Sequence, residues 1–194
     1  ITKEQQAVLE LISQSMVRLR TMIDSLLSYN AIRTSKDSVS EVEFGNLINK
    51  INSHFEHRLT AKQQRLNWHN SITKQPLALP AELIEMTLIQ LISNALKFSN
   101  TGQSVDVTLA LEQKLLTIQV RDEGCGIKEQ EKTQIFSAFY QGKHNKDVTL
   151  QGSGLGLTIV KESVEQLQGQ LSVEHNQPQG CLFTIKIPLI NQGV

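Results

Sequence analysis

Three polar side chains lie on one stripe of a mostly apolar segment at residues 81–98. Gln90, Asn94 and Lys97 stand at positions i, i+4 and i+7, which a helix brings onto one face. Apolar residues, chiefly Leu and Ile, fill most of the remaining positions, and a helix this apolar must be largely buried. Because buried polar groups need partners, the stripe either faces water or faces a polar ligand.

A second cluster follows an alternating apolar pattern that ends at Val120 and Arg121. The loop reads Asp122, Glu123, Gly124, Cys125, Gly126 and Ile127. A carboxylate at a strand end can accept a hydrogen bond from an exocyclic amine, and glycines let the backbone approach a flat ring closely. The same Asp-x-Gly-x-Gly pattern is equally compatible with a tight loop that binds nothing.

A third cluster, Gly-Ser-Gly-Leu-Gly-Leu at 152–157, stands where a helical pattern begins. Helix N-termini offer free amide donors and a positive dipole end to phosphate, although one Gly-x-Gly is a weak signal. The chain lacks the Rossmann fingerprint, because Leu157 stands where its last glycine is required. It also lacks a Walker-type loop.

The elements that must position these clusters follow from the hydrophobic periodicity. Helical patterns cover 2–33, 44–62, 81–98 with Pro80 in its first turn, and 155–167 with Gly169 at its end. Strand patterns cover 39–44, 66–68, 105–111, 116–120, 171–173 and 182–187. This order predicts an α+β fold, a two-layer α/β sandwich with a mixed sheet and helices on one face, preceded by one long helix.

The first helical pattern is a heptad seam. Apolar residues recur at spacings of three and four, at Leu9, Ile12, Met16, Leu19, Ile23 and Leu26. A narrow seam of this kind prefers another helix as its partner, as in a coiled coil. We therefore expect a rod at the start of the chain, separated from the rest by a polar linker at 34–40.

Composition excludes several classes. The 194 residues carry 19 basic and 19 acidic side chains, so no basic excess suggests nucleic acid or an anionic membrane as partner. Cys125 and Cys181 have no metal-ligand spacing, and we expect free thiols in a reducing compartment. No apolar run is long enough to span a bilayer. Because the chain begins with Ile1, we expect it to be a soluble piece of a longer protein.

Taken in order, these motifs resemble the ATP-binding domain of sensor histidine kinases, in the wider superfamily of DNA gyrase, MutL-type repair ATPases and the heat-shock chaperone ATPase. LISNALKF at 91–98 is similar to that family's N box, IFSAFYQG at 135–142 to its F box, and GCLFTIKIPL from Gly180 to its last strand. The resemblance implies a Bergerat-type ATP-binding fold with ATP and Mg²⁺ as cofactors. It divides the chain into the second helix of a dimerisation and phosphotransfer hairpin at 1–35 and a catalytic domain at 36–194.

At the adenine end, the resemblance implies that Asp122 holds the amino group. Gly124 and Gly126 would shape the pocket, and Ile127 would pack against the ring.

At the phosphate end, the resemblance implies two catalytic residues, Asn94 coordinating Mg²⁺ and Lys97 adding positive charge. A lid at 142–151 would close over the phosphates. The other residues implied to contact the nucleotide are Phe98, Tyr140, Lys143, Gly152, Ser153, Gly154, Leu155, Gly156 and Leu157.

Two positions depart from the family pattern. Gln90 stands where these kinases usually have the first N-box Asn, and where hydrolytic relatives carry a general-base Glu. A glutamine cannot accept a proton at neutral pH, which favours phosphoryl transfer over hydrolysis. Gln141 stands where the F box commonly continues with Arg, so the basic phosphate contact could fall to Lys143, His144 or Lys146.

The leading hypothesis is a two-component sensor histidine kinase domain that transfers the γ-phosphoryl group of ATP to a histidine upstream of Ile1. None of the five histidines here has the family's His-Glu/Asp-x-x-Pro setting. The resemblance implies the missing phosphoacceptor helix, a response regulator and a second copy of the chain as partners. It also implies a cytoplasmic domain of a membrane-anchored bacterial sensor. The alternatives are an ATPase or ATP-driven clamp of the superfamily, and a non-catalytic nucleotide-binding or docking module.

Overall fold

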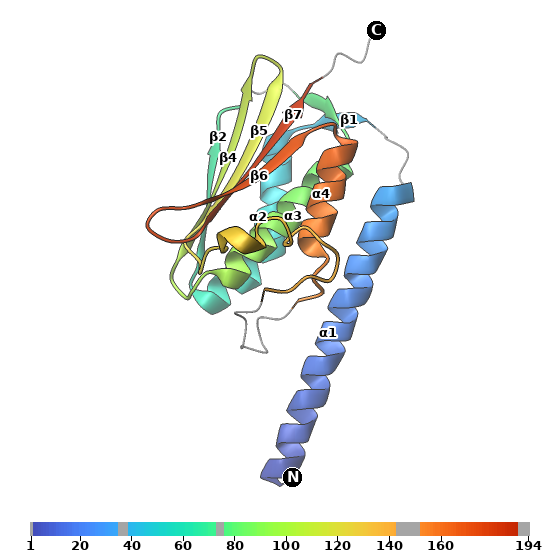
Figure 1. The fold of residues 1–194 in the computed structure, drawn as a ribbon, viewed down its shortest axis with the longest axis vertical. Coiled ribbons are helices and arrows are strands. Elements are labelled where there is room, and N and C mark those ends of the chain that lie inside the picture. Colours follow the sequence, from blue (N-terminus) through green and yellow to red (C-terminus); the bar gives the residue numbers. More distant parts are fainter. Residues whose placement is uncertain (1, 35–38, 73–75, 143–151, 190–194) are drawn as a thin grey trace.

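The computed structural model describes residues 2–34, 39–72, 76–142 and 152–189 (Figure 1). The helices are α1 (Lys3–Thr34), α2 (Phe44–Lys62), α3 (Ala81–Phe98) and α4 (Gly156–Gln166), with a single 3-10 turn η1 (Glu129–Glu131). The strands are β1 (Ser40–Val42), β2 (Arg65–Asn70), β3 (Leu77–Leu79), β4 (Ser104–Glu112), β5 (Leu115–Asp122), β6 (Gln170–His175) and β7 (Cys181–Pro188).

Five strands form one mixed sheet in the order β2-β4-β5-β7-β6. Only the β2–β4 pair is parallel, and the other three pairs are antiparallel. The β4–β5 hairpin turns at Gln113 and Lys114, as the alternation predicts, and both residues adopt positive φ. The short strands β1 and β3 pair separately as an antiparallel ribbon, and the sequence pattern does not predict β3.

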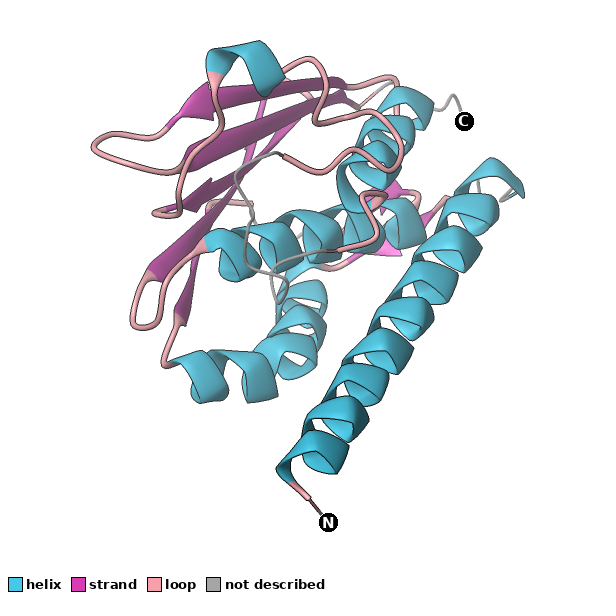
Figure 2. Ribbon diagram, turned by 60° about the horizontal axis from the view of Figure 1, so that its bottom comes forward, coloured by secondary structure: helices cyan, strands magenta, loops and turns pink. Residues whose placement is uncertain are grey.

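Helices α2, α3 and α4 cover one face of this sheet (Figure 2). The alternating apolar residues of β4 and β5 point into the layer between sheet and helices, where Val107, Ile118 and Leu88 are fully buried. Polar residues of the same strands face the opposite side. The predicted α+β two-layer sandwich is therefore confirmed.

Helices α2 and α3 run parallel to one another. Lys50 forms an ion pair with Glu85 near their starts, at 2.8 Å, and Arg58 donates a hydrogen bond to Ser93 near their ends. The C-terminal end of α3 is fixed by buried Gln64, whose amide donates to the carbonyl oxygens of Leu96, Ser99 and Asn100. The last turn of α3 is therefore held from the α2 side.

The end of α4 differs in detail from the prediction. The left-handed residue after the helix is Gln168, with a φ of 53°, and not Gly169. Gly169 is required for another reason: a Cβ built on it would lie 2.8 Å from the carbonyl oxygen of Lys186 on β7.

Helix α1 is the long rod that the heptad seam predicts, and it lies beside the sandwich in contact with α4 (Figure 1). Its six seam residues are between 42% and 67% exposed. None of the helices in the described part of the chain combines the length and apolar content required to cross a bilayer.

Candidate functional site

The glycine that begins α4 lies directly against the polar stripe of α3. A Cβ built on Gly156 would lie 2.9 Å from Oε1 of Gln90 and 3.5 Å from Nδ2 of Asn94. Gln90 and Asn94 are half-buried, while their neighbours Leu91 and Ile92 are in the core. The stripe therefore faces the N-terminal end of α4, where free amide donors are available.

The loop before α4 contacts the remaining member of the stripe. A Cβ on Gly152 would lie 2.8 Å from Nζ of Lys97, so a larger side chain would displace the ammonium group. Gly154 has a φ of +72°, and a Cβ there would lie 2.7 Å from the backbone of Phe139. The backbone N–H of Phe139 donates to the carbonyl oxygen of Gly154 at 3.0 Å. Two glycines thus allow this loop to pass between α3 and the F-box segment.

The Asp-x-Gly-x-Gly loop lies at the C-terminal end of the same helix. A Cβ on Gly124 would lie 2.7 Å from the carbonyl oxygen of Phe98, the last residue of α3. Oδ1 of Asp122 accepts hydrogen bonds from the backbone N–H groups of Gly124 at 2.8 Å and Cys181 at 3.2 Å. The tertiary structure therefore brings the Asp122 loop and the 152–156 loop to one helix, α3.

Asp122 is a buried carboxyl group, only 5% exposed. Burial raises its pKa, and the two backbone hydrogen bonds partly oppose that rise. Its carbonyl oxygen also accepts from the amide of Asn176, which fixes the end of β5. Gly126, with a φ of +75°, and half-buried Ile127 continue the loop along the same edge.

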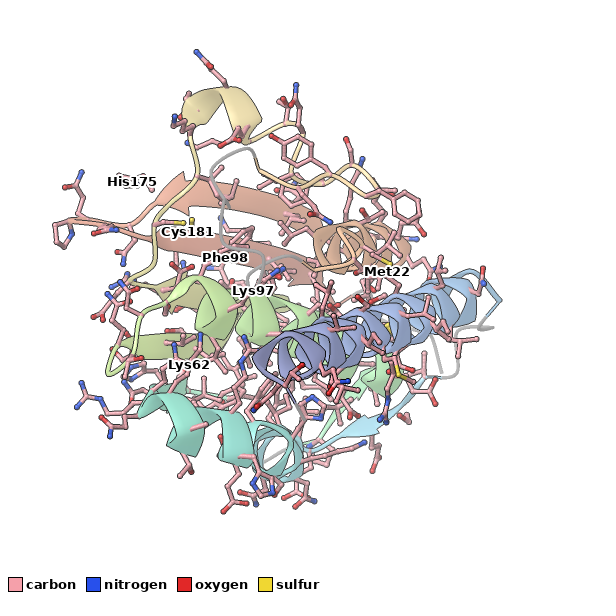
Figure 3. The ribbon with its side chains drawn as sticks, turned by 90° about the horizontal axis from the view of Figure 1, so that it is seen from below. Met22, Lys62, Lys97, Phe98, His175 and Cys181 are labelled. Atoms are coloured by element: carbon pink, nitrogen blue, oxygen red, sulfur yellow. The ribbon has the colours of Figure 1, made fainter. Side chains whose placement is uncertain are left out.

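Lys97 is the cation of the site, and its environment disfavours the charged form. Burial, and then the positive charge of Arg58, lower its pKa to about 8. Its Nζ atom lies 5.0 Å from the ring centroid of Phe98. In Figure 3 the labelled side chains of Lys97 and Phe98 lie together near the end of α3.

The other residues expected to contact the nucleotide lie in the F-box segment, at the start of α4 and in the expected lid. The Tyr140 hydroxyl donates to the Glu131 carboxylate at 3.1 Å, which joins the F-box segment to η1. Leu155 buries its side chain in the core, while Leu157 packs against the core half-buried. Lys143 and most of the expected lid lie outside the described residues.

The Ser153 hydroxyl connects the glycine loop with α1. It accepts from the backbone N–H of Leu155 at 3.2 Å and lies 3.1 Å from the hydroxyl of Ser25 on α1.

Gln141 has a structural partner that sequence reasoning missed. Its side-chain amide donates to the carbonyl oxygen of Gly152 at 2.7 Å. The residue type alone carries no signal for this bond, because the two residues approach only through the folding of the loop.

The donor set at Asn94 fits a hard divalent cation. Its amide makes no hydrogen bond to the described residues, and amide and carboxylate oxygens are the ligands that Mg²⁺ uses together with water and phosphate oxygens. Among the described residues, no three His, Cys, Asp or Glu side chains gather in a metal-binding group. Asn94 would hold such a cation together with water and phosphate oxygens.

Comparison with known proteins gives one consistent family. Residues 80–191 match the family described as histidine kinase-, DNA gyrase B-, and HSP90-like ATPase. Sensor histidine kinase GlrK of Escherichia coli K12 is 30% identical over 193 residues, which are 97% of this chain and 39% of that protein. Autoinducer 2 sensor kinase/phosphatase LuxQ of Vibrio vulnificus YJ016 is 30% identical over 93% of this chain and 22% of its own length. The chain thus spans well under half of these relatives.

Three solved structures align with nearly the whole of this chain. Full-length ShkA in complex with AMPPNP aligns with a TM-score of 0.77 at 22% identity, over 97% of this chain and 39% of its own. ThkA in complex with the response regulator protein TrrA aligns with a TM-score of 0.76 at 20% identity, over 98% and 53% of the two chains. Acinetobacter baumannii histidine kinase AdeS aligns with a TM-score of 0.67 at 25% identity, over 97% of this chain and 84% of its own.

Proposed function

Because this chain belongs to the histidine kinase-, DNA gyrase B- and HSP90-like ATPase family, we propose that it is the ATP-binding catalytic domain of a sensor histidine kinase. The reaction is transfer of the ATP γ-phosphoryl group to a histidine on a helix outside this chain. One observation carries the proposal: the 152–156 glycine loop contacts the polar stripe of α3, and the Asp122 loop packs on the C-terminal end of the same helix.

Adenine binds at Asp122. The carboxylate accepts a hydrogen bond from the exocyclic amine, while its Oδ1 atom is already oriented by Gly124 and Cys181. Gly124 packs closely on the end of α3 and so fixes the position of this loop, and the adenine ring would lie against the loop beside Ile127. A buried carboxylate gives a selective contact, because a base without the donor would leave it unpaired.

The phosphates bind between α3 and the start of α4. Lys97 and the amides near Gly152 and Gly156 supply the positive electrostatic environment, and Asn94 would hold Mg²⁺. The cation, when bound, neutralises charge on the phosphate oxygens. Positioning and charge neutralisation are the main demands of phosphoryl transfer, so this chain needs no covalent group of its own.

Gln90 supports transfer rather than hydrolysis. Its Oε1 atom lies beside Gly156, where a carboxylate could activate water, but an amide cannot act as a general base. The phosphoryl acceptor is therefore a protein side chain.

The test is a titration of the chain with Mg-ATP, with Asp122→Asn as the variant. The amide retains an oxygen for Gly124 and Cys181, so we expect a folded protein whose affinity for ATP is at least tenfold lower. Asn94→Ala should weaken Mg-ATP binding more than binding of ATP in EDTA. Equal affinity of the wild type and Asp122→Asn would reject the adenine site, and absence of any ATP binding would favour the docking-module alternative.

A longer chain that includes the preceding hairpin helix separates kinase from ATPase. We expect radioactive phosphate from γ-labelled ATP to become bound to histidine in that chain, with an acid-labile linkage. Release of inorganic phosphate at the same rate without labelled protein would instead support the ATPase alternative.

The full-length protein is further proposed to be a homodimer through α1. Six seam residues on α1 are exposed, and a seam of this length on one helix suits burial against other helices. In the longer chain, Ile23→Glu should weaken self-association in sedimentation velocity, whereas Ser13→Glu, also on α1 and exposed, should not. Unchanged dimerisation in both variants would place the interface elsewhere.

A response regulator is the proposed downstream partner, by analogy with the complex of ThkA and TrrA. A cytoplasmic position beside a membrane anchor is proposed for the domain, on the basis of its sensor-kinase relatives alone.

A further inference from the structure

Three basic side chains gather where α2 and α3 end. Arg58 and Lys62 come from the last turns of α2, and Lys97 comes from the last turn of α3. Figure 3 shows Lys62 and Lys97 at the same end of these two helices. Burial and then the positive charge of Arg58 lower the pKa of both lysines, so Arg58 lies close enough to repel each of them.

No carboxylate of the described residues compensates this charge. The ion pairs within 4.0 Å in that part of the chain involve other residues, and the only hydrogen bond of the Arg58 side chain goes to the neutral hydroxyl of Ser93, at 3.3 Å. Burial lowers the pKa of the Arg58 guanidinium as well. Half-buried cations without a counter-charge are unfavourable, and an anion bound among them would remove that cost.

The position of Arg58 relates this cluster to the nucleotide. Ser93, which accepts from Arg58, directly precedes Asn94, and Lys97 lies one turn further along α3. Lys97 in turn lies against Gly152, at the loop that begins α4. Arg58 thus flanks the phosphate end of the site from the α2 side, opposite the glycine loop.

The F box supplies no positive charge at position 141, at the phosphate end of the site. Gln141 is neutral, and its amide is used for a hydrogen bond to the Gly152 carbonyl oxygen. A guanidinium has five N–H donors in a planar fork that matches phosphate, and Ser93 uses only one of those on Arg58.

We propose that Arg58 is a phosphate-contacting residue that binds the terminal phosphate of ATP from helix α2 and supplies the charge that Gln141 lacks. This inference rests on the proposed function, since it assigns a further residue to the same nucleotide site. It also makes α2 part of the site, although no glycine or acidic motif marks that helix. Because Arg58 would contact only the terminal phosphate, it would favour ATP over nucleotides with shorter phosphate chains.

The experiment compares ATP, ADP and adenosine by calorimetric titration of the 194-residue chain, with Mg²⁺ present. Arg58→Gln should weaken ATP binding about tenfold or more, because a charge-assisted hydrogen bond is lost. ADP should be affected less, and adenosine not at all. Arg58→Lys should recover much of the loss, which a purely structural role for the planar side chain would not produce.

Arg65→Gln is the matched control. Arg65 begins β2 and is exposed, while Trp68 of the same strand hydrogen-bonds to Asn52 on α2, so Arg65 is on the face turned away from the helices. This variant removes the same charge and should bind all three ligands like the wild type. Thermal unfolding of each variant checks that the chain remains folded.

A second measurement needs no variant. The Nε–Hε resonance of Arg58 in the wild type should shift when Mg-ATP is added and stay in place with adenosine. Equal ATP affinities of the wild type and Arg58→Gln, or an unmoved resonance, would overturn the assignment while leaving the Asp122 site intact. If the wild type binds no nucleotide, both the assignment and the proposed function fail together.

Discussion

The proposed phosphate contact of Lys97 can be tested through pH, because its pKa of about 8 lies within an accessible range. A bound triphosphate stabilises the charged ammonium form, so nucleotide binding and protonation of Lys97 favour each other. We therefore expect the affinity for Mg-ATP to fall as the pH rises through about 8.

The magnitude follows from the protonated fraction. A group with a pKa of about 8 is about 90% protonated near pH 7 and about 10% near pH 9. If only the ammonium form contacts the phosphates, the dissociation constant rises about tenfold over this interval, which corresponds to ~1.4 kcal/mol.

The assay is a series of calorimetric titrations with Mg-ATP between about pH 7 and about pH 9, with adenosine as the control ligand. Lys97→Met should bind ATP more weakly near pH 7 and show a flat profile. A wild-type affinity that stays constant across the range, or a Lys97→Met profile as steep as that of the wild type, would refute the reasoning.

The same group affects the stability of the nucleotide-free chain. Because the folded-state pKa of Lys97 is below its ordinary value of 10.5, the folded chain binds fewer protons than the unfolded chain between about pH 8 and 10.5. The contribution of Lys97 to the free energy of unfolding therefore rises with pH across that window. Lys97→Met should remove this contribution, as measured by urea titration at each pH.

Two further predictions concern the adenine end of the site. Gly180→Ala should lower the free energy of unfolding by more than about 3 kcal/mol in a urea titration, because φ is +116° and the new Cβ would overlap the carbonyl oxygen of Asp122. Gly102→Ala, where φ is +82° but nothing lies within 4 Å, should cost about 1 kcal/mol, and similar losses in both would contradict the steric argument. Exposed Cys125 should react with iodoacetamide before buried Cys181, whose pKa is raised to about 12 chiefly by burial. ATP should slow the labelling of Cys125, as followed by mass spectrometry. Equal labelling of both thiols in the folded chain would be inconsistent with this structure.

Much of the fold could be predicted because it depends on local pattern. The apolar periodicity of Phe44–Lys62 gives α2 its observed bounds, and Pro80 stands at the N-terminal boundary of α3. The alternation in β4 and β5 reports which residues face the core, since successive strand residues point to opposite sides. By contrast, β3 spans only Leu77–Leu79, which is too short for any periodicity to be recognised.

The candidate site was predictable where a motif requires unusual backbone. Gly126 and Gly154 adopt positive φ, and Gly124 packs within 2.7 Å of a carbonyl oxygen, so their residue type reflects local geometry. Arg58 and Gln141 carry no such requirement. Their roles depend on Ser93, 35 positions away, and Gly152, 11 positions away.

The sequence by itself determined the α-helices, the strands other than β3, the glycine loops and the polar stripe on α3, because each is encoded by residues within a few turns of one another. Only the tertiary structure decided that the Asp122 loop, the glycine loop before α4 and the end of α2 all contact the one helix α3. These approaches join segments far apart in the chain. They arise when helices and sheet bury their apolar faces together, which fixes the relative positions of elements that local patterns leave open.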